Sequence, residues 1–183
     1  MFQRLFGGER VRNRQIVSAL YEKIVAAARR ELFFSDWDVP DTPLGRFEMI
    51  GLHMFLFQHR LRGETGMARD IAQELIDDFF TDVEHSLREL GIGDMGVPKR
   101  MKKLARMFYG RTASYEAALE AGNRGELAAA LARNIRPDAA GWPHAADLAD
   151  YVFAARDLLA GQGVGTLCAG TIEFPRPQAT TVH

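Results

Sequence analysis

Residues 49–57 read MIGLHMFLF, and this run decides the fold. It lies in a predicted helix over residues 43–62, with Thr42 as the N-cap and Pro43 as the first helical residue. Apolar side chains fall on almost every side of this helix, a pattern typical of a helix at the centre of a bundle. The run is about half as long as the roughly 20 apolar residues that a membrane span needs, so we do not expect it to cross a bilayer.

Helical periodicity also marks most of the remaining chain. Asn13 is the candidate N-cap of the first helix, and the loop over residues 32–43 is expected to hold at most one helical turn. No alternating strand pattern of useful length occurs. Besides the central helix, the predicted helices cover residues 13–30, 67–90, 98–122, 124–134 and 143–160.

The sequence therefore predicts an all-α fold, a single-domain bundle of six to seven helices with an irregular C-terminal tail. We expect a basic N-terminal segment over residues 1–12, a helical domain over 13–160 and the tail over 161–183. Apolar side chains at helical spacing are expected to form the core: Phe47, Ile50, Met54, Phe57, Leu75, Phe79, Leu104 and Phe108.

The composition is that of a soluble globular protein, with 47% hydrophobic and 26% charged residues in a chain of 183. The single cysteine, Cys168, excludes an internal disulfide bond and a cysteine-based metal site, and it fits a reducing compartment. Residues 1–15 lack the apolar core of a secretory signal. We therefore expect a cytoplasmic protein, either free in solution or peripheral on a membrane.

The net charge of −1 hides a strong segregation of charge along the chain. Residues 63–95 carry a net charge of −7, whereas residues 96–136 carry +6. Six cations fall between Lys99 and Arg111, in a predicted helix that also carries Met and aromatic side chains. Such asymmetry indicates an oriented electrostatic surface.

The predicted basic helix keeps its cations apart from its apolar side chains. At about 100° per residue, Met101, Leu104 and Phe108 lie on one stripe that faces the core. Four cations lie on the far side of the helix, and two flank the core stripe. The candidate partner-binding residues are therefore Lys99, Arg100, Lys102, Lys103, Arg106 and Arg111.

Two interpretations of this helix remain open. Either its cations keep the helix soluble and pair with the acidic helix over 67–90, or they bind an anionic surface such as RNA phosphate, lipid headgroups or an acidic protein patch. The absence of acids between Lys99 and Tyr115 favours the second, because a solvated helix usually mixes charges of both signs. Four N-terminal arginines would extend the same surface: Arg4, Arg10, Arg12 and Arg14.

Chemistry-bearing motifs are missing from the sequence. It contains no phosphate-binding loop, dinucleotide-binding fingerprint, H-E-x-x-H or G-x-S-x-G. His53, on the apolar helix, is expected to be a hydrogen-bonded core residue. A di-iron site in a helical bundle needs two Glu-x-x-His motifs and two further Glu residues, and the D-x-x-H at 82–85 is only one weak form of that motif. An enzymatic interpretation would depend on His53, His59 and His85 alone, so no catalytic residue, metal or cofactor is predicted.

Several stretches resemble the ubiquinol–cytochrome c chaperone family, the assembly factors of the cytochrome bc1 complex, in a bacterial form. The resemblance covers roughly residues 12–160. Its most specific parts are D-x-x-x-G-R-F-E-M at 41–49 and K-R-M-K-x-x-A-x-x-F-Y-G-R at 99–111.

The resemblance implies a non-enzymatic assembly chaperone that binds newly made cytochrome b. Mitochondrial members bind near the ribosomal tunnel exit and pair with a small second protein. By similarity, the six cations between Lys99 and Arg111 would be contact residues, and the location would be cytoplasmic or peripheral on the inner membrane. The alternative function is a ribosome- or nucleic-acid-binding module that uses the basic helix over residues 98–115.

Overall fold

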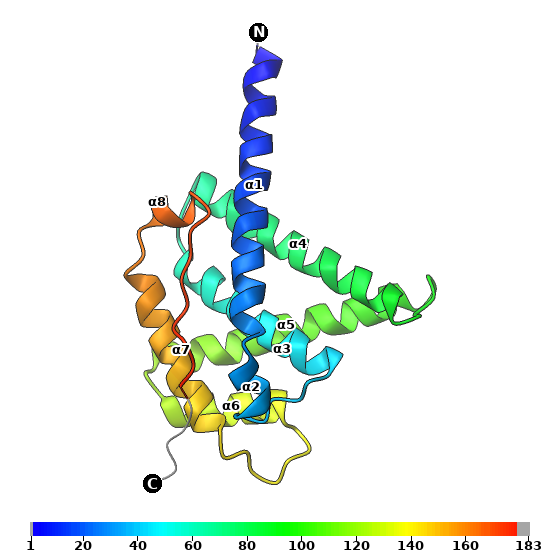
Figure 1. Ribbon diagram of the computed structural model, residues 1–183, viewed down its shortest axis with the longest axis vertical. Helices are drawn as coiled ribbons and strands as arrows, with labels where there is room; N and C mark the ends of the chain where they lie inside the picture. The colour runs from blue at the N-terminus through cyan, green and yellow to red at the C-terminus, as the bar shows by residue number, and fades with distance from the viewer. Residues whose placement is uncertain (1, 179–183) are drawn as a thin grey trace.

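The computed structural model describes the backbone of residues 2–178 and the side chains of residues 11–178. These residues form eight helices and no strand, which confirms the predicted all-α fold (Figure 1). None of the helices in this range combines the length and apolar character that a transmembrane span requires. The helices are α1 Phe2–Ala28, α2 Glu31–Ser35, α3 Pro43–Arg60, α4 Met67–Glu89, α5 Val97–Glu120, α6 Arg124–Ile135, α7 Ala145–Ala160 and α8 Val164–Leu167.

Local sequence signals set several of these bounds. The Thr42 hydroxyl caps α3 by accepting a hydrogen bond from the Gly45 amide at 3.1 Å, and Pro43 opens the helix as predicted. Gly66 and Gly91 flank α4 with positive φ values of 61° and 79°, a conformation that favours glycine. The single turn α2 confirms the helical turn expected in the loop over residues 32–43.

The first helix differs from its prediction. Helix α1 begins at Phe2 and runs through Asn13, so Asn13 is not an N-cap. Residues 2–12 contain no proline, and Gly7 and Gly8 weaken a helix without ending it. Of the four N-terminal arginines, Arg14 pairs with Asp78 of α4 at 2.6 Å and Arg12 is exposed, whereas the side chains of Arg4 and Arg10 lie outside those described.

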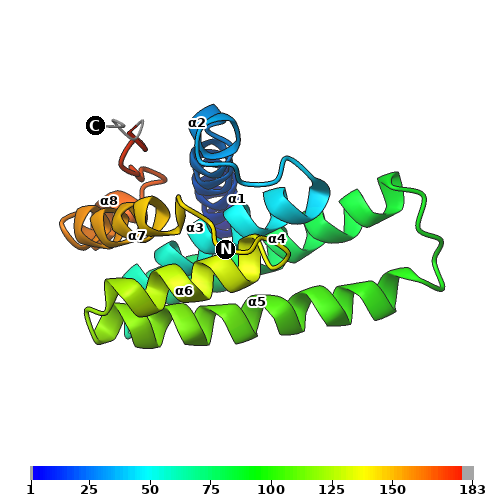
Figure 2. The same ribbon diagram turned by 90° about the horizontal axis from the view of Figure 1, so that it is seen from below.

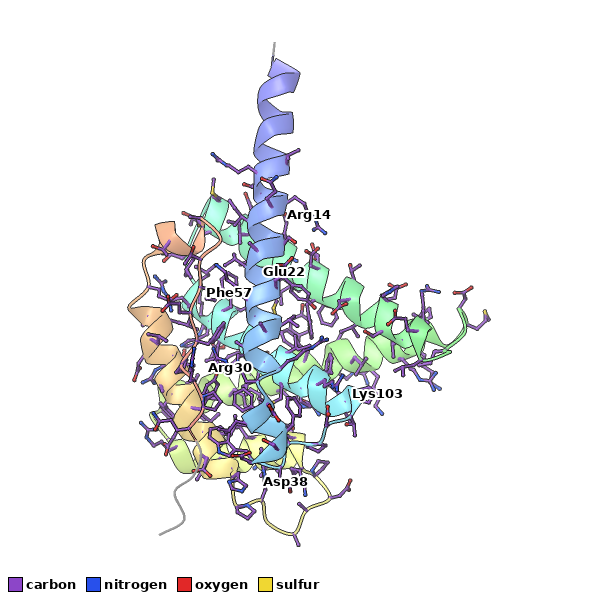
Figure 3. The ribbon with its side chains drawn as sticks, viewed as in Figure 1. Arg14, Glu22, Arg30, Asp38, Phe57 and Lys103 are labelled. Carbon is purple, nitrogen blue, oxygen red and sulfur yellow. The ribbon has the colours of Figure 1, made fainter. Side chains whose placement is uncertain are left out.

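Helix α3 is the centre of the bundle. It packs against α1, α4, α5, α6 and α7, and every residue from Phe47 to Phe57 is buried. Phe57, labelled in Figure 3, lies inside the bundle next to α1. Burial on all sides explains why the helix is apolar all round, and it confirms the central position expected from the run at 49–57.

Seven of the eight predicted core side chains are buried, and Leu104 is the exception. Leu104 is only partly buried because it lines an open groove between helices. The core also holds one polar centre. His53 donates from Nδ1 to the Met49 carbonyl at 2.8 Å and accepts at Nε2 from the Tyr151 hydroxyl at 2.7 Å, which confirms the predicted hydrogen-bonded core histidine.

Helices α4 and α5 form an antiparallel hairpin whose connecting loop stands at the edge of the molecule, away from α7 (Figure 2). On the opposite side, residues 171–178 run without regular structure beside α1. The Lys23 ammonium donates to the Gly170 carbonyl at 2.9 Å, and the Arg30 guanidinium donates to the carbonyls of Phe174 and Pro175. Ile172 is buried, so this segment belongs to the folded core.

Candidate functional site

The basic face of the molecule lies on the first half of α5. It consists of cations that are all exposed: Lys99, Arg100, Lys102, Lys103 and Arg106. Lys103, labelled in Figure 3, marks its place near the α4–α5 loop. Among the ion pairs and hydrogen bonds of the described residues, none involves a side chain of these five.

The acidic helix before it does not neutralise the basic face. Asp78 of α4 pairs with Arg14, and Asp82 accepts a hydrogen bond from the Tyr21 hydroxyl at 2.9 Å, so both acids are turned toward α1. Glu84 pairs with Arg88 of its own helix at 2.8 Å. In the described structure, therefore, pairing between α4 and α5 does not account for the five cations.

The cations at the start of α5 also do not stabilise the helix itself. The first turn of α5 contains Lys99 and Arg100 and no acid. A helix N-terminus carries a partial positive charge, so cations there destabilise the helix slightly and acids would stabilise it. Helix stability therefore gives no reason for this placement.

Arg111, the sixth predicted contact residue, lies apart from the basic face. Its Nη1 forms an ion pair with Oε1 of Glu48 at 2.5 Å, and the two side chains are only 16% and 4% exposed. Burial raises the pKa of Glu48 to about 7, an effect that the nearby Arg111 charge opposes. Arg111 thus fastens α5 to α3, and its guanidinium is not available at the surface.

This ion pair joins the two sequence motifs that carry the family resemblance. Glu48 belongs to the motif at 41–49 and Arg111 to the motif at 99–111. The same interface brings the Phe108 ring to 3.5 Å from the position that a Cβ on Gly51 would occupy. At Gly45 the backbone of the preceding loop passes so close that a Cβ would lie 1.9 Å from the Pro40 carbonyl oxygen. The Glu48–Arg111 pair therefore joins the two motifs across the α3–α5 contact, and Gly45 lets the preceding loop pass close to the start of α3.

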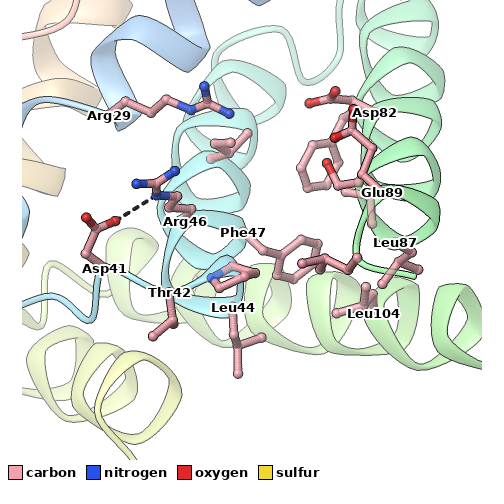
Figure 4. Close-up of a pocket in the computed structure, with 16 residues that line it drawn as sticks. Arg29, Asp41, Thr42, Leu44, Arg46, Phe47, Asp82, Leu87, Glu89 and Leu104 are labelled. Atoms are coloured by element: carbon pink, nitrogen blue, oxygen red, sulfur yellow. Dashed lines mark hydrogen bonds and ion pairs between the residues drawn. The ribbon is translucent and has the colours of Figure 1, made fainter. Parts of the chain in front are cut away.

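A groove of about 690 Å³ opens beside this contact, between the ends of α1 and α3 and the second half of α4, with α5 beneath (Figure 4). Its floor and walls are mainly apolar: Phe47, Ile50, Phe79, Val83, Leu87 and Leu104. Leu44, at its edge, is 49% exposed. Five of these six residues are buried, so the apolar surface accessible to solvent in the groove is mainly that of Leu44, Leu90 and Leu104. A surface of this kind binds apolar ligands or segments.

Charges of opposite sign stand on the two sides of the groove. Arg29 and Arg46 lie on the α1 and α3 side, and Arg46 pairs with Asp41 at 2.7 Å. Asp82 and Glu89 lie across from them on α4 (Figure 4). A segment that fits the groove would thus be apolar in its middle and would meet acids along α4.

The histidines considered for catalysis have separate surroundings. His53 is fully buried in the core, and burial lowers its pKa to about 4. His59 lies 3.7 Å from Glu116, and His85 lies 3.2 Å from Glu89 on the exposed side of α4. In the described part of the chain, no three His, Cys, Asp or Glu side chains come together as metal ligands would.

The groove was not predicted from the sequence. Its lining comes from three helices and the residues that flank them. Periodicity assigns most of its apolar residues to the buried faces of their helices, and it does not show where two such faces fail to meet. The Glu48–Arg111 pair left a weak signal, because Glu48 is a charged residue inside an otherwise apolar helix. A buried charge of this kind usually requires a partner of opposite charge.

Comparisons with known proteins point to one group of relatives. The family model described as ubiquinol-cytochrome C chaperone matches residues 35–174. The crystal structure of the Cbp3 homolog from Brucella abortus superimposes with a TM-score of 0.89 and 55% sequence identity, over 96% of this chain and 97% of that chain.

A curated relative is the ubiquinol-cytochrome-c reductase complex assembly factor 1 of Xenopus laevis, which is 26% identical over 103 residues. The match covers 56% of this chain and 51% of that protein, so the chain spans about half the length of this relative.

Proposed function

The chain belongs to the ubiquinol–cytochrome c chaperone family, and from this premise we propose that it is a non-enzymatic assembly chaperone that holds newly made cytochrome b during biogenesis of the bc1 complex. Its relatives support the bc1 part of this proposal, since the Xenopus protein is named as an assembly factor of that complex. Two surfaces have separate roles in the proposal: the groove for the client, and the basic face for an anionic partner.

The observation that carries the proposal is the groove. Its floor residues are apolar and largely buried, and Leu44, Leu90 and the partly buried Leu104 expose apolar surface to water in it. Exposure of such a surface is costly unless a partner covers it. A segment of a membrane protein is predominantly apolar and must be kept from water until it is inserted. We therefore assign an apolar segment of cytochrome b as the occupant.

Charge complementarity supports this occupant. Lys and Arg are common beside the apolar segments of membrane proteins. In the groove such flanking cations would meet Asp82 and Glu89 along α4, while the apolar stretch would cover Phe47 and Leu104. A binding surface of this kind needs no turnover, which agrees with a holding function.

The alternative function is a ribosome- or nucleic-acid-binding module that uses the basic face. The observation that favours it is the set of five unpaired cations, which suits phosphate as well as any other anion. Deleting the gene and measuring bc1 activity beside total protein synthesis separates the two functions. The chaperone predicts a selective loss of bc1, and the alternative predicts a general loss of synthesis.

The groove is tested by filling it. Ser86 is exposed and lines the groove, so Ser86→Trp should block it without removing a core contact, and Leu44→Glu should make its edge polar. We expect either variant to capture several-fold less cytochrome b in a co-purification and to lower bc1 levels.

Matched controls exist on other helices. Ser18→Trp on α1 and Leu158→Glu on α7 change exposed residues that do not line the groove. They should behave as wild type. Normal cytochrome b capture by the two groove variants, in proteins that remain folded, would show that the client binds elsewhere.

A further inference from the structure

The loop between α4 and α5 carries exposed apolar side chains at the edge of the molecule. Met95 is 96% exposed, more than any other large hydrophobic residue among those described, and Leu90 is 58% exposed. The loop lies at the end of the α4–α5 hairpin, away from the rest of the bundle (Figure 1). Met95 is therefore presented outward, whereas Leu90 also lines the end of the groove and Ile92 is partly buried.

This hairpin tip, residues 90–96, continues directly into the basic face. Residues 88–106 have a net charge of +4. The acids nearest the tip already have partners, since Asp94 pairs with Arg88 and Glu89 lies 3.2 Å from His85. The tip therefore presents the exposed apolar side chain of Met95. The five cations of the basic face, which have no ion-pair partner among the described residues, follow it within about three turns of helix.

We propose that the hairpin tip and the basic face together dock the protein on a bilayer that contains anionic phospholipids. The cations of α5 contact the phosphate and carboxylate groups of the lipids. Met95 enters the boundary between headgroups and acyl chains. Neither element alone binds firmly, because peripheral attachment generally requires both an apolar insertion and a cationic patch.

Lipid fits this surface better than RNA does. Single-stranded RNA is usually held by aromatic side chains that stack on its bases. On α5, Phe108 and Tyr115 are buried, and Tyr109, although 57% exposed, has its ring packed against those of Phe80 and Phe108. The free side chain beside the cations is instead a flexible, aliphatic methionine, which suits a lipid interface.

Sedimentation with vesicles tests the proposal on the purified protein. Phosphatidylcholine vesicles with about 30 mol% phosphatidylglycerol should bind the protein at about 50 mM salt and release it at about 500 mM, while pure phosphatidylcholine should not bind it. Charge reversal of Lys99, Lys102, Lys103 and Arg106 to Glu should abolish binding. Met95→Ser should weaken it about fivefold, in line with the loss of one apolar side chain from the interface.

Matched controls use cations and apolar residues elsewhere. Arg69→Glu with Arg133→Glu changes two exposed cations on α4 and α6, and Val11→Ser changes an exposed apolar residue on α1. These variants should bind vesicles as wild type does. The assay contains no cytochrome b, so its result is independent of the chaperone proposal.

Insertion of the tip has a direct optical readout. The two native tryptophans, Trp37 and Trp142, are buried at 3% and 6% exposure, so a Met95→Trp variant adds one probe at the tip against a buried background. Its added fluorescence should shift to the blue and be quenched by brominated phosphatidylglycerol vesicles.

Two outcomes overturn the proposal. One is the absence of sedimentation with anionic vesicles, with or without binding to a labelled single-stranded RNA, since RNA binding alone would assign the basic face to the nucleic-acid alternative. The other is vesicle binding that Met95→Ser leaves unchanged while the Met95→Trp probe stays in water, because the tip would then take no part.

Discussion

At the scale of single residues, Glu48 and Arg111 show how a family motif can be structural. Both side chains are ionisable and both are nearly buried, so each charge needs the other to compensate for lost solvation. Removing one partner of such a pair leaves an uncompensated buried charge, which is far more costly than an exposed one. We therefore expect a role for Arg111 in orienting α5 on α3, and not in partner contact.

The raised pKa of Glu48 makes a prediction about pH. Glu48 has a pKa of about 7 in the folded protein against 4.5 ordinarily, so between these values the folded state binds more protons than the unfolded chain. Stability then falls as pH rises. Relative to the variant Glu48→Gln, the wild type should lose about 1–3 kcal/mol of unfolding free energy between about pH 5 and pH 7, measured by urea unfolding.

The comparison with Glu48→Gln is needed because His53 acts in the opposite direction. The pKa of His53 is lowered to about 4, so its contribution to stability rises over much of the same pH range and partly hides that of Glu48 in the wild type alone. Asp41→Asn is the control, since the ordinary pKa of Asp41, 3.8, already lies below this range and the Arg46 guanidinium lowers it further. A difference between wild type and Glu48→Gln that stays constant with pH would mean that Glu48 ionises normally.

Two glycines give a second residue-scale prediction. A methyl group on Gly45 would lie 1.9 Å from the Pro40 carbonyl oxygen, whereas one on Gly110 of α5 would meet nothing within 4 Å. Gly45→Ala should therefore cost about 3 kcal/mol or more, and Gly110→Ala should stabilise α5 by about 0.5–1 kcal/mol. Thermal unfolding of the two variants measures both. Equal melting temperatures of the two variants would show that the loop before α3 moves to accommodate the Gly45→Ala methyl group without loss of stability.

At the scale of elements, the sequence predicts each long helix, but it predicts less well which side of a helix is buried. The all-round apolar run of α3 and the cap at Thr42 are local signals, and they led to the right element. Leu104 was expected in the core because it lies on the apolar stripe of α5, but α3 and α4 diverge above it and leave the groove. Such divergence depends on the angles at which three helices cross, and the sequence pattern of a single helix does not give these angles.

The charges of α5 give the prediction at this scale. Reversing Lys99, Lys102, Lys103 and Arg106 to Glu should leave the fold intact, with a change in unfolding free energy within about 1 kcal/mol, because these side chains are exposed and unpaired in the described structure. The change at Lys99 should even favour the helix, since it puts an acid in the first turn. Circular dichroism melting checks this expectation.

The same four-fold variant should fail in function. We expect it to lose its salt-sensitive association with membranes or ribosomes and to lower cytochrome b levels in cells. The paired change Arg69→Glu with Arg133→Glu, which alters the charge elsewhere, should not. Unfolding of the four-fold variant would show that these four cations have partners within the bundle. Normal bc1 assembly by the folded variant would show that the cations only keep the helix soluble.

At the scale of the whole molecule, contacts between distant parts of the chain escaped the sequence analysis. Phe174 packs its ring against His53, with centroids 5.0 Å apart, and Ile172 is buried. The sequence of this stretch, rich in Gly, Thr and Pro, does not predict such burial, because the segment has neither helical nor strand periodicity. The hydrogen bonds that hold it come from the side chains of Lys23, Arg30 and Gln162, which sequence patterns would assign to exposed positions.

The attachment of residues 170–175 to α1 has a consequence for the timing of folding. Lys23 and Arg30 are synthesised before the segment that they hold, which follows about 145 residues later. Contacts so distant along the chain form late, after the intervening helices have collapsed. A nascent chain that has not reached residue 170 must therefore leave part of α1 and one side of His53 without the contacts of this segment. The helical core around α3 and the covering of His53 by Phe174 should thus be separate steps in the folding of the chain.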